Sequence, residues 1–246
     1  IAMYNMETST KSPLIAALAS EPLKSRIASG ELKIRLIFEG YGKPEDNNKK
    51  MQDLENLGLD VRYLGAGKMI HHKFAVIDVG SENPMLITGS ANWSLSSRQY
   101  YSENIVFMES EQTITAQYSQ EFEKLWLYSH EFGKTLQAPE FVNLYQVLNP
   151  DLFAVFNSEN FVFSKTSVLS KKPNTSVVTD FLKSQIQKAE KSLQIASTRV
   201  HLVPLMEEIK AAVDRHVKVQ IIVSQDEFST GLRGPLRDLL KANPAI

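Results

Sequence analysis

Apolar positions in the first half of the chain switch several times between a two-residue period and a period close to 3.6 residues. Strand-like segments occur at 1–4, 33–38, 60–64 and 103–107. Helical spacing occurs at 13–18, at 47–57 and on a face made by Ile114, Tyr118, Phe122, Leu125 and Trp126. Ser12 and Pro13 predict the start of the first helix, and Gly58 predicts the end of the second. Strands that alternate with helices predict an α/β sheet with helices packed on its faces.

The same order of elements begins again late in the chain. A strand is expected at 193–197, followed by a helix whose apolar face is formed by Leu202, Leu205, Met206, Ile209 and Val213. The next strand, at 218–223, matches 33–38 at an offset of 185 residues (218 − 33 = 185). A helix at 235–242 then takes the place of the helix at 47–57. This recurrence predicts an internal repeat.

These patterns define the predicted architecture. The fold class is α/β, a mixed and mainly parallel sheet flanked by helices, in a tandem pseudo-two-fold repeat whose second copy is incomplete. The first half spans 1–127, a connecting segment spans 128–176, and the start of the second half spans 177–246. Apolar stretches in the connecting segment are long enough for one or two strands.

Polar side chains interrupt the apolar pattern near the middle of the first half. His71 and Lys73 are two residues apart, so in a strand they project from the same face, whereas His72 points to the other. Ser90 and Asn92 have the same spacing. If the two segments are neighbouring strands, an imidazole, an ammonium, a hydroxyl and an amide converge on a pocket that suits a phosphodiester. A single histidine on an apolar strand is more often structural, so the combination matters more than any one residue.

The combination resembles a known motif. His71, Lys73 and Asp78 fit the pattern H-x-K-x-x-x-x-D of the phospholipase D superfamily, and Gly89, Ser90 and Asn92 fit its downstream G-S-x-N. The resemblance implies a phospholipase D-like fold and metal-independent phosphodiester chemistry. It also leaves both substrate classes of that superfamily open, because its members include lipases and nucleases.

The resemblance further implies a role for each residue. His71 is the expected nucleophile and forms a phosphohistidine intermediate, while Lys73 and Asn92 hold phosphate oxygens and Ser90 adds a hydroxyl donor. Glu103 matches a position where an acid hydrogen-bonds the imidazole. The motif residues Asp78 and Gly89 are expected to be structural. No metal and no cofactor are expected.

A single motif makes half of a site in this superfamily. Adding 185 to 71 places a second motif histidine near residue 256, beyond Ile246. The second motif is therefore expected from a downstream segment or from another chain, and we interpret the sequence as an internal piece of a longer protein. A degenerate second motif would instead indicate a non-catalytic binding module. The other histidines, His130, His201 and His216, lie outside any motif and are expected to be ordinary surface or helix-end residues.

Composition narrows the remaining choices. The chain has no cysteine, which excludes disulfides and cysteine-bearing metal sites. Its formal net charge of −1 gives no general basic field, which favours a phospholipid over DNA or RNA as the substrate. No apolar run approaches the roughly 20 residues that cross a bilayer, so no transmembrane segment is expected. The compartment stays unknown: a soluble protein is expected, and export is compatible with the sequence.

Overall fold

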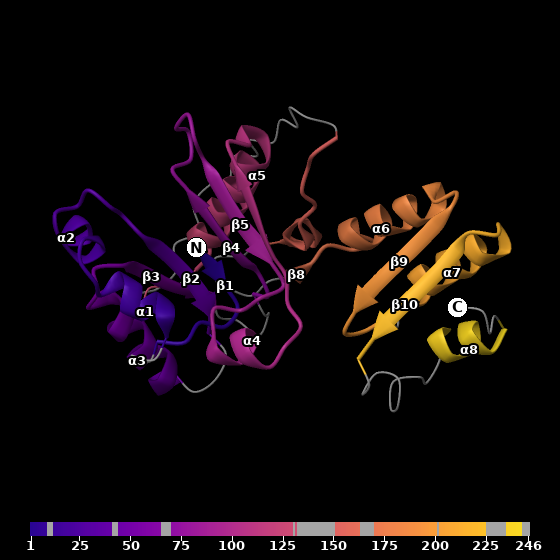
Figure 1. The fold of residues 1–246 in the computed structure, drawn as a ribbon, viewed down its shortest axis with the longest axis horizontal. Coiled ribbons are helices and arrows are strands. Elements are labelled where there is room, and N and C mark those ends of the chain that lie inside the picture. Colours follow the sequence, from indigo (N-terminus) through magenta and orange to yellow (C-terminus); the bar gives the residue numbers. More distant parts are fainter. Residues whose placement is uncertain are drawn as a thin grey trace. The chain divides into compact units, whose positions relative to one another are not determined.

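The computed structural model describes residues 1–8, 12–40, 44–64, 70–129, 131, 151–162, 170–200, 202–224 and 235–242. The chain divides into two compact units, of which the first contains 1–154 and 161–172 and the second contains 155–160 and 173–246. The first unit follows the order β1 (Ala2–Met3), α1 (Pro13–Leu18), α2 (Leu23–Ala28), β2 (Arg35–Glu39), α3 (Pro44–Glu55), β3 (Asp60–Leu64), β4 (Lys73–Ile77), β5 (Met85–Gly89), α4 (Leu95–Gln99), β6 (Ile105–Glu109), α5 (Gln112–Leu127), β7 (Phe161–Val162) and β8 (Ser170–Lys171) (Figure 1).

A six-stranded sheet forms the centre of the first unit, in the order β3-β2-β1-β4-β5-β6. The pairs β1–β2 and β2–β3 are parallel, and the pairs β1–β4, β4–β5 and β5–β6 are antiparallel. Four of the six strands, β1, β2, β3 and β5, therefore run in one direction. The mixed α/β sheet that the sequence predicts is confirmed, with its antiparallel pairs gathered in the half that contains the motif.

Each face of the sheet has its own apolar core. On one face, Ala2, Ile37 and Phe74 pack against α5. On the other face, Met3 and Phe38 pack against α1, α2 and α3. Alternation along the strands produces this division, because neighbouring residues project to opposite sides.

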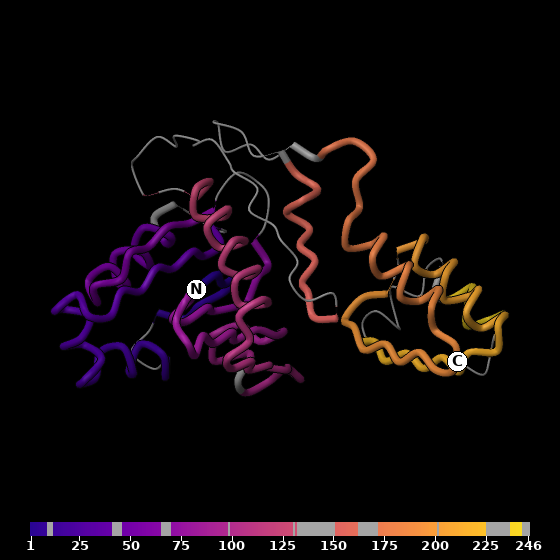
Figure 2. Tube along the Cα trace, turned by 90° about the horizontal axis from the view of Figure 1, so that it is seen from above, coloured from indigo at the N-terminus to yellow at the C-terminus, as the bar shows by residue number. Residues whose placement is uncertain are grey.

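The second unit contains a short 3₁₀ helix (Asn157–Asn160), α6 (Val177–Lys188), β9 (Ser192–Ser197), α7 (Val203–Asp214), β10 (Lys218–Val223) and α8 (Pro235–Ala242), drawn from orange to yellow in Figure 2. β9 and β10 pair in parallel. One apolar core joins the strands and helices, formed by Ile186, Val200, Met206, Ile209, Ala212, Val217, Val219 and Leu239. None of the described helices in either unit is long and apolar enough to cross a membrane.

Most predicted elements are found close to their expected bounds. β3, β10 and α8 have the predicted limits, whereas β2 and β6 each begin two residues later than expected. The short helices α2 and α4 were not predicted. Five or six residues show little apolar period, and neither helix begins with a Ser-Pro pair as the equally short α1 does. In the connecting segment, Phe161–Val162 forms a strand and 153–156 does not.

Candidate functional site

The motif side chains lie where β4 begins, beside β1. Lys73 opens β4 and pairs with Met3, so it projects toward the face covered by α1, α2 and α3. The backbone N–H of Tyr4 donates to the carbonyl of His72 (2.8 Å), which extends the pairing to the residues just before β4. His71 and Lys73 therefore share a face, as predicted from their spacing. His72 turns to the opposite face, where its ring contacts Phe74 edge-on at 5.4 Å between centroids.

Lys73 and His71 are in direct contact. The Nζ atom of Lys73 lies 3.0 Å from Nδ1 and 3.5 Å from Nε2 of His71, and it also donates to the carbonyl oxygen of His71 (2.8 Å). An ammonium can only donate, so the ring nitrogen that it contacts is unprotonated. The ring of Tyr4 lies beside both groups, with its centroid 4.7 Å from the imidazole centroid and 5.2 Å from Nζ. This cation–π and ring contact fixes the position of both side chains.

Burial shifts the protonation of this pair. Lys73 is only 8% exposed, and burial lowers its pKa from 10.5 to about 8, while the negative charge of Glu103 opposes the shift. The pKa of His71 is lowered from 6.5 by burial and by the neighbouring Lys73 and His72. At neutral pH the imidazole is therefore mostly unprotonated while most of the lysine remains charged.

Asn92 is held by the segment that follows β1. The backbone N–H of Asn5 donates to Oδ1 of Asn92 (3.3 Å), and the N–H of Glu7 donates to the carbonyl of Trp93 (3.1 Å). The Glu7 carboxylate in turn accepts from the N–H of Leu95 (3.0 Å). Because a backbone N–H can only donate, the oxygen of the Asn92 amide must face Asn5. The NH₂ group of that amide donates to no described residue and is available to a ligand.

Ser97 connects Asn92 to Glu103. Its side chain is 5% exposed, accepts from the backbone N–H of Asn92 (3.2 Å) and donates to Oε1 of Glu103 (3.3 Å). The position of Ser97 depends on α4, which begins after Ser94, whose hydroxyl accepts from the N–H of Ser97 (3.4 Å). No hydrogen bond joins Glu103 to His71, although both residues are described. Glu103 instead acts on the motif through its charge on Lys73.

The remaining motif residues shape the backbone around the site. Two reciprocal hydrogen bonds between Ser90 and Asn104 connect the adjacent ends of β5 and β6. Ser90 Oγ accepts from the Asn104 N–H (3.0 Å), and Asn104 Oδ1 accepts from the Ser90 N–H (2.8 Å). Gly89 has φ +148°, and a Cβ atom there would lie 2.2 Å from the carbonyl oxygen of Asn104. Asp78 has φ +51° in an exposed turn, where its carbonyl accepts from the N–H of Ser81 (3.0 Å). The Asp78 carboxylate bonds no described residue, so its observed role is conformational.

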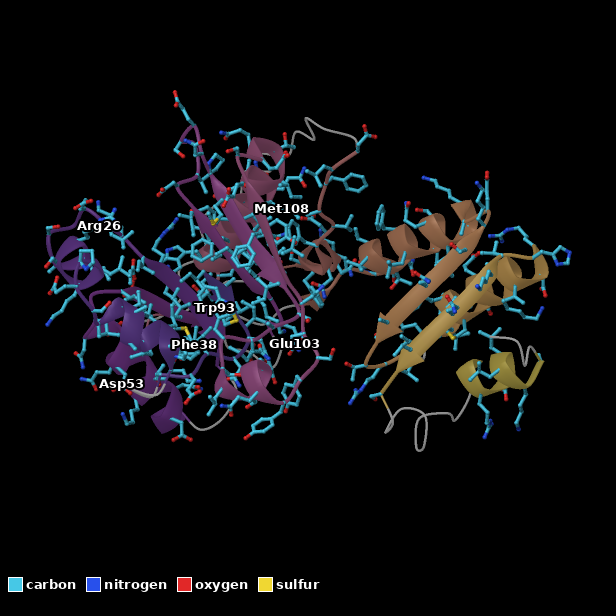
Figure 3. The ribbon with its side chains drawn as sticks, viewed as in Figure 1. Arg26, Phe38, Asp53, Trp93, Glu103 and Met108 are labelled. Carbon is cyan, nitrogen blue, oxygen red and sulfur yellow. The ribbon has the colours of Figure 1, made fainter. Side chains whose placement is uncertain are left out.

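A cavity of about 400 Å³ opens beside Asn92. Its walls come from the start of α1, the segment before α4 and the start of β6. Figure 3 labels two of the lining residues, Trp93 and Glu103. The described residues that line it are Ser12, Pro13, Leu14, Ala91, Asn92, Trp93, Ser94, Ser97, Glu103 and Ile105.

Comparison with known proteins identifies the family. A family model described as "Cardiolipin synthase, PLD-like domain" matches residues 1–126 of the 246. The chain belongs to the phospholipase D-like family. The matched stretch contains every site residue predicted from the sequence, from His71 to Glu103.

Relatives of this phospholipase D-like chain include mitochondrial cardiolipin hydrolases. The Xenopus tropicalis protein is 38% identical over 73 residues, which cover 30% of this chain and 32% of that protein. The Canis lupus familiaris protein is 35% identical over 89 residues, which cover 36% of this chain and 32% of that protein. The chain thus spans about a third of the length of these curated relatives. Among solved structures, polyphosphate kinase from Porphyromonas gingivalis aligns with 90% of this chain and with 32% of its own chain. The TM-score is 0.54 and the sequence identity is 13%, so this similarity shows a shared fold and no more.

Three residues of the candidate site were not predicted from the sequence. Tyr4 and Ser97 make their contacts through tertiary structure, and neither stands in a recognisable spacing with His71. The third is Glu39 at the end of β2, whose carboxylate accepts from the backbone N–H of Ile70, next to the motif. Burial raises the pKa of Glu39 from 4.5 to about 7, against the opposing effect of that hydrogen bond. One feature of the sequence could have indicated Glu39: it is an acidic residue at the end of an apolar strand.

Other predicted positions fall outside the site or outside the described residues. His130 and His201 are not among the described residues. His216 is an exposed residue in the turn after α7, with φ +65°. Among the residues that the structure describes, no three histidine, aspartate or glutamate side chains gather as they would to hold a metal ion.

Proposed function

We propose that this chain provides half of the active site of a phosphodiesterase in which His71 is the nucleophile. The observation that supports this most directly is the contact between Lys73 and His71, which places a buried cation 3.0 Å from an unprotonated imidazole nitrogen. In this arrangement the nitrogen accepts a hydrogen bond from Lys73. A phosphate oxygen that takes over the hydrogen bond from Lys73 would free the nitrogen for attack. Substrate binding and activation of the nucleophile are thereby linked.

The proposed reaction has two displacements. The imidazole lone pair of His71 attacks phosphorus, the bond from phosphorus to the leaving oxygen breaks, and this oxygen takes a proton from an acid supplied by a second motif. Water or an alcohol then attacks phosphorus, loses its proton to that group, and the phosphorus–nitrogen bond breaks. Covalent catalysis of this kind replaces one difficult step by two easier ones. The positive charge comes from Lys73 and from the second motif, so the proposal requires no metal and no cofactor.

The neighbouring groups have supporting roles in this proposal. The NH₂ group of Asn92, whose oxygen faces Asn5, donates to one non-bridging phosphate oxygen, and the ammonium of Lys73 donates to another. Ser90, which directly follows the last residue of β5, provides a hydroxyl donor to the phosphate. Glu103 keeps Lys73 protonated through its charge and reaches Asn92 through Ser97. This role replaces the direct bond to His71 that the resemblance implied.

We also propose that residues 177–246 begin a second copy of the fold, connected to residues 1–127 by 128–176. The support is the order of elements: β9, α7, β10 and α8 follow one another as β1, the helices α1 and α2, β2 and α3 do, and each strand pair is parallel. The partner motif then comes from a downstream segment or from another chain. If a second copy completes the site, activity of residues 1–246 should rise with the square of protein concentration. If a downstream segment does, residues 1–246 alone should be inactive at every concentration.

A phospholipid is the favoured substrate. The curated relatives are named as cardiolipin hydrolases, and the formal net charge of −1 offers no general attraction for a polyanion. The alternative within the same chemistry is a nuclease that cleaves DNA or RNA. A non-catalytic binding module is the outcome if the second motif is degenerate.

The test measures hydrolysis of bis(p-nitrophenyl) phosphate by the full-length protein in the presence of a chelator. His71→Ala should reduce kcat/KM more than a thousandfold while leaving the melting temperature within a few degrees, because the side chain is exposed. His216→Asn is the matched control, since it removes an exposed histidine from a left-handed position that asparagine tolerates. Rapid quench into alkali followed by mass spectrometry should find the phosphoryl adduct on His71. Turnover that needs a metal, or that survives His71→Ala, would contradict the mechanism.

A further inference from the structure

We propose that the cavity beside Asn92 binds the uncharged, apolar part of a lipid phosphodiester, namely the glycerol ester unit and the first carbons of its acyl chains. The inference rests on the proposed function, because it places the diester phosphorus at His71. Beyond that function, the proposal assigns a place to the glycerol ester unit, the group that a phospholipid has and a nucleic acid lacks.

The lining of the cavity favours an uncharged occupant. Five of its ten residues are apolar: Pro13, Leu14, Ala91, Trp93 and Ile105. Glu103 is the only charged side chain among the ten, and all ten are described. Among the described lining residues, a second phosphate placed here would meet a carboxylate and no cation. A nucleic acid strand has a phosphate at every nucleotide, whereas the acyl side of a phospholipid has none.

The volume limits how much of a lipid can enter. A cavity of about 400 Å³ has room for roughly 13 atoms of water size, at about 30 Å³ for each. That number suits a glycerol ester unit with a few methylene groups, and it is too small for two complete acyl chains. Most of each chain must therefore lie outside the cavity.

An exposed apolar surface next to the cavity can contact the part of each acyl chain that lies outside it. Ile105 lines the cavity and opens β6, and Phe107, two residues further on the same side, is 63% exposed. Through the β5–β6 and β4–β5 pairs, Phe107 shares its face of the sheet with Lys73. Tyr100 and Tyr101, in the connection between α4 and β6, are 77% and 63% exposed. Tyrosine combines an apolar ring with a polar tip and is enriched where protein meets a lipid headgroup region.

The test compares phosphatidylcholines with different short acyl chains, used below their micelle concentrations. For the wild-type full-length protein, kcat/KM should be at least tenfold higher for the dihexanoyl ester than for the diacetyl ester. Ala91→Leu and Leu14→Trp, which narrow the cavity, should each lower kcat/KM for the dihexanoyl ester more than for the smaller diacetyl ester, and so reduce this ratio at least threefold. Leu202→Trp, at an exposed leucine of the second unit, is the matched control and should leave the ratio unchanged.

A ratio of the two kcat/KM values that neither narrowing variant lowers overturns the assignment of the cavity, because a narrower cavity should exclude the longer acyl chains first. Hydrolysis of a thymidine trinucleotide whose KM rises in the same variants would assign the cavity to a nucleoside instead. If the protein hydrolyses no diester, the proposed function fails, and the fluorescence of Trp93 with dihexanoylglycerol decides the cavity by itself. A change that Ala91→Leu removes supports lipid binding, and an absent change overturns it.

Discussion

The low pKa of Lys73 predicts a specific loss of activity in mild alkali. If the charged ammonium is needed to hold phosphate, kcat/KM follows the protonated fraction of Lys73 in the free enzyme. With a pKa of about 8, this fraction is about 90% at pH 7 and about 10% at pH 9. The expected result is a roughly tenfold decrease in kcat/KM between these pH values. A lysine with the ordinary pKa would remain almost fully charged at pH 9 and give no such decrease.

The assay should use bis(p-nitrophenyl) phosphate with alkaline quenching. Its leaving group departs without help from an acid, so the titration of a partner histidine does not contribute to the basic limb. Glu103→Gln provides an internal check, because removing the charge that raises the pKa of Lys73 should move the basic limb to lower pH. The acidic limb belongs to His71 and should lie below pH 6.5. A profile that stays flat to pH 9.5, or a limb that Glu103→Gln leaves in place, would refute the reasoning.

Stability should change in the opposite direction over the same range. Between pH 8 and pH 10.5, the unfolded chain binds a proton at Lys73 that the folded chain does not. The contribution of Lys73 to the free energy of unfolding therefore rises with pH in this window, by up to roughly 3 kcal/mol. Chemical denaturation of the wild type and of Lys73→Met should show this difference in slope.

Three further changes test other parts of the site. Gly89→Ala should lower the free energy of unfolding in urea by more than about 2 kcal/mol because its Cβ meets backbone, whereas Gly80→Ala, at φ +84° in open space, should cost about 1 kcal/mol. Between pH 4.5 and 7 the folded wild type binds a proton at Glu39 that the unfolded chain has lost, so its free energy of unfolding should fall as the pH rises. Glu39→Gln should remove this fall and, at pH 8, should have a free energy of unfolding roughly 3 kcal/mol above that of the wild type, measured by thermal denaturation. Ser97→Ala should cost about 1–3 kcal/mol and lower kcat/KM because it leaves two polar partners unsatisfied, while the exposed Ser96→Ala should change neither.

Local patterns predicted the parts of this molecule that depend on periodicity. Alternation gave β3 and β10 their correct limits, and the two-residue spacing of His71 and Lys73 placed them on one face because strand geometry leaves no other choice. The partner of Glu103 could not be predicted in this way. It depends on the path of the chain through α4, a five-residue helix that brings Ser97 between Asn92 and Glu103.

The contact of Tyr4 with the motif was equally inaccessible from local pattern. It arises because β1, the first strand in the chain, lies between β2 and β4 in the sheet. No rule of residue spacing relates positions 4 and 71. Only the topology of the complete sheet brings them together.

The segment that follows β1 determines when the site can form during folding. Its hydrogen bonds to Asn92 and Leu95 join residues that are 87 and 88 positions apart in the sequence. Contacts of such separation close large loops and form slowly compared with helices and hairpins. The hairpin of β4 and β5 can assemble from neighbouring residues, but it then lacks an oriented Asn92. Synthesis must therefore extend past Leu95 before the proposed phosphate site can form, and the exchange of the amide protons of Asn5 and Glu7 should report when these contacts close.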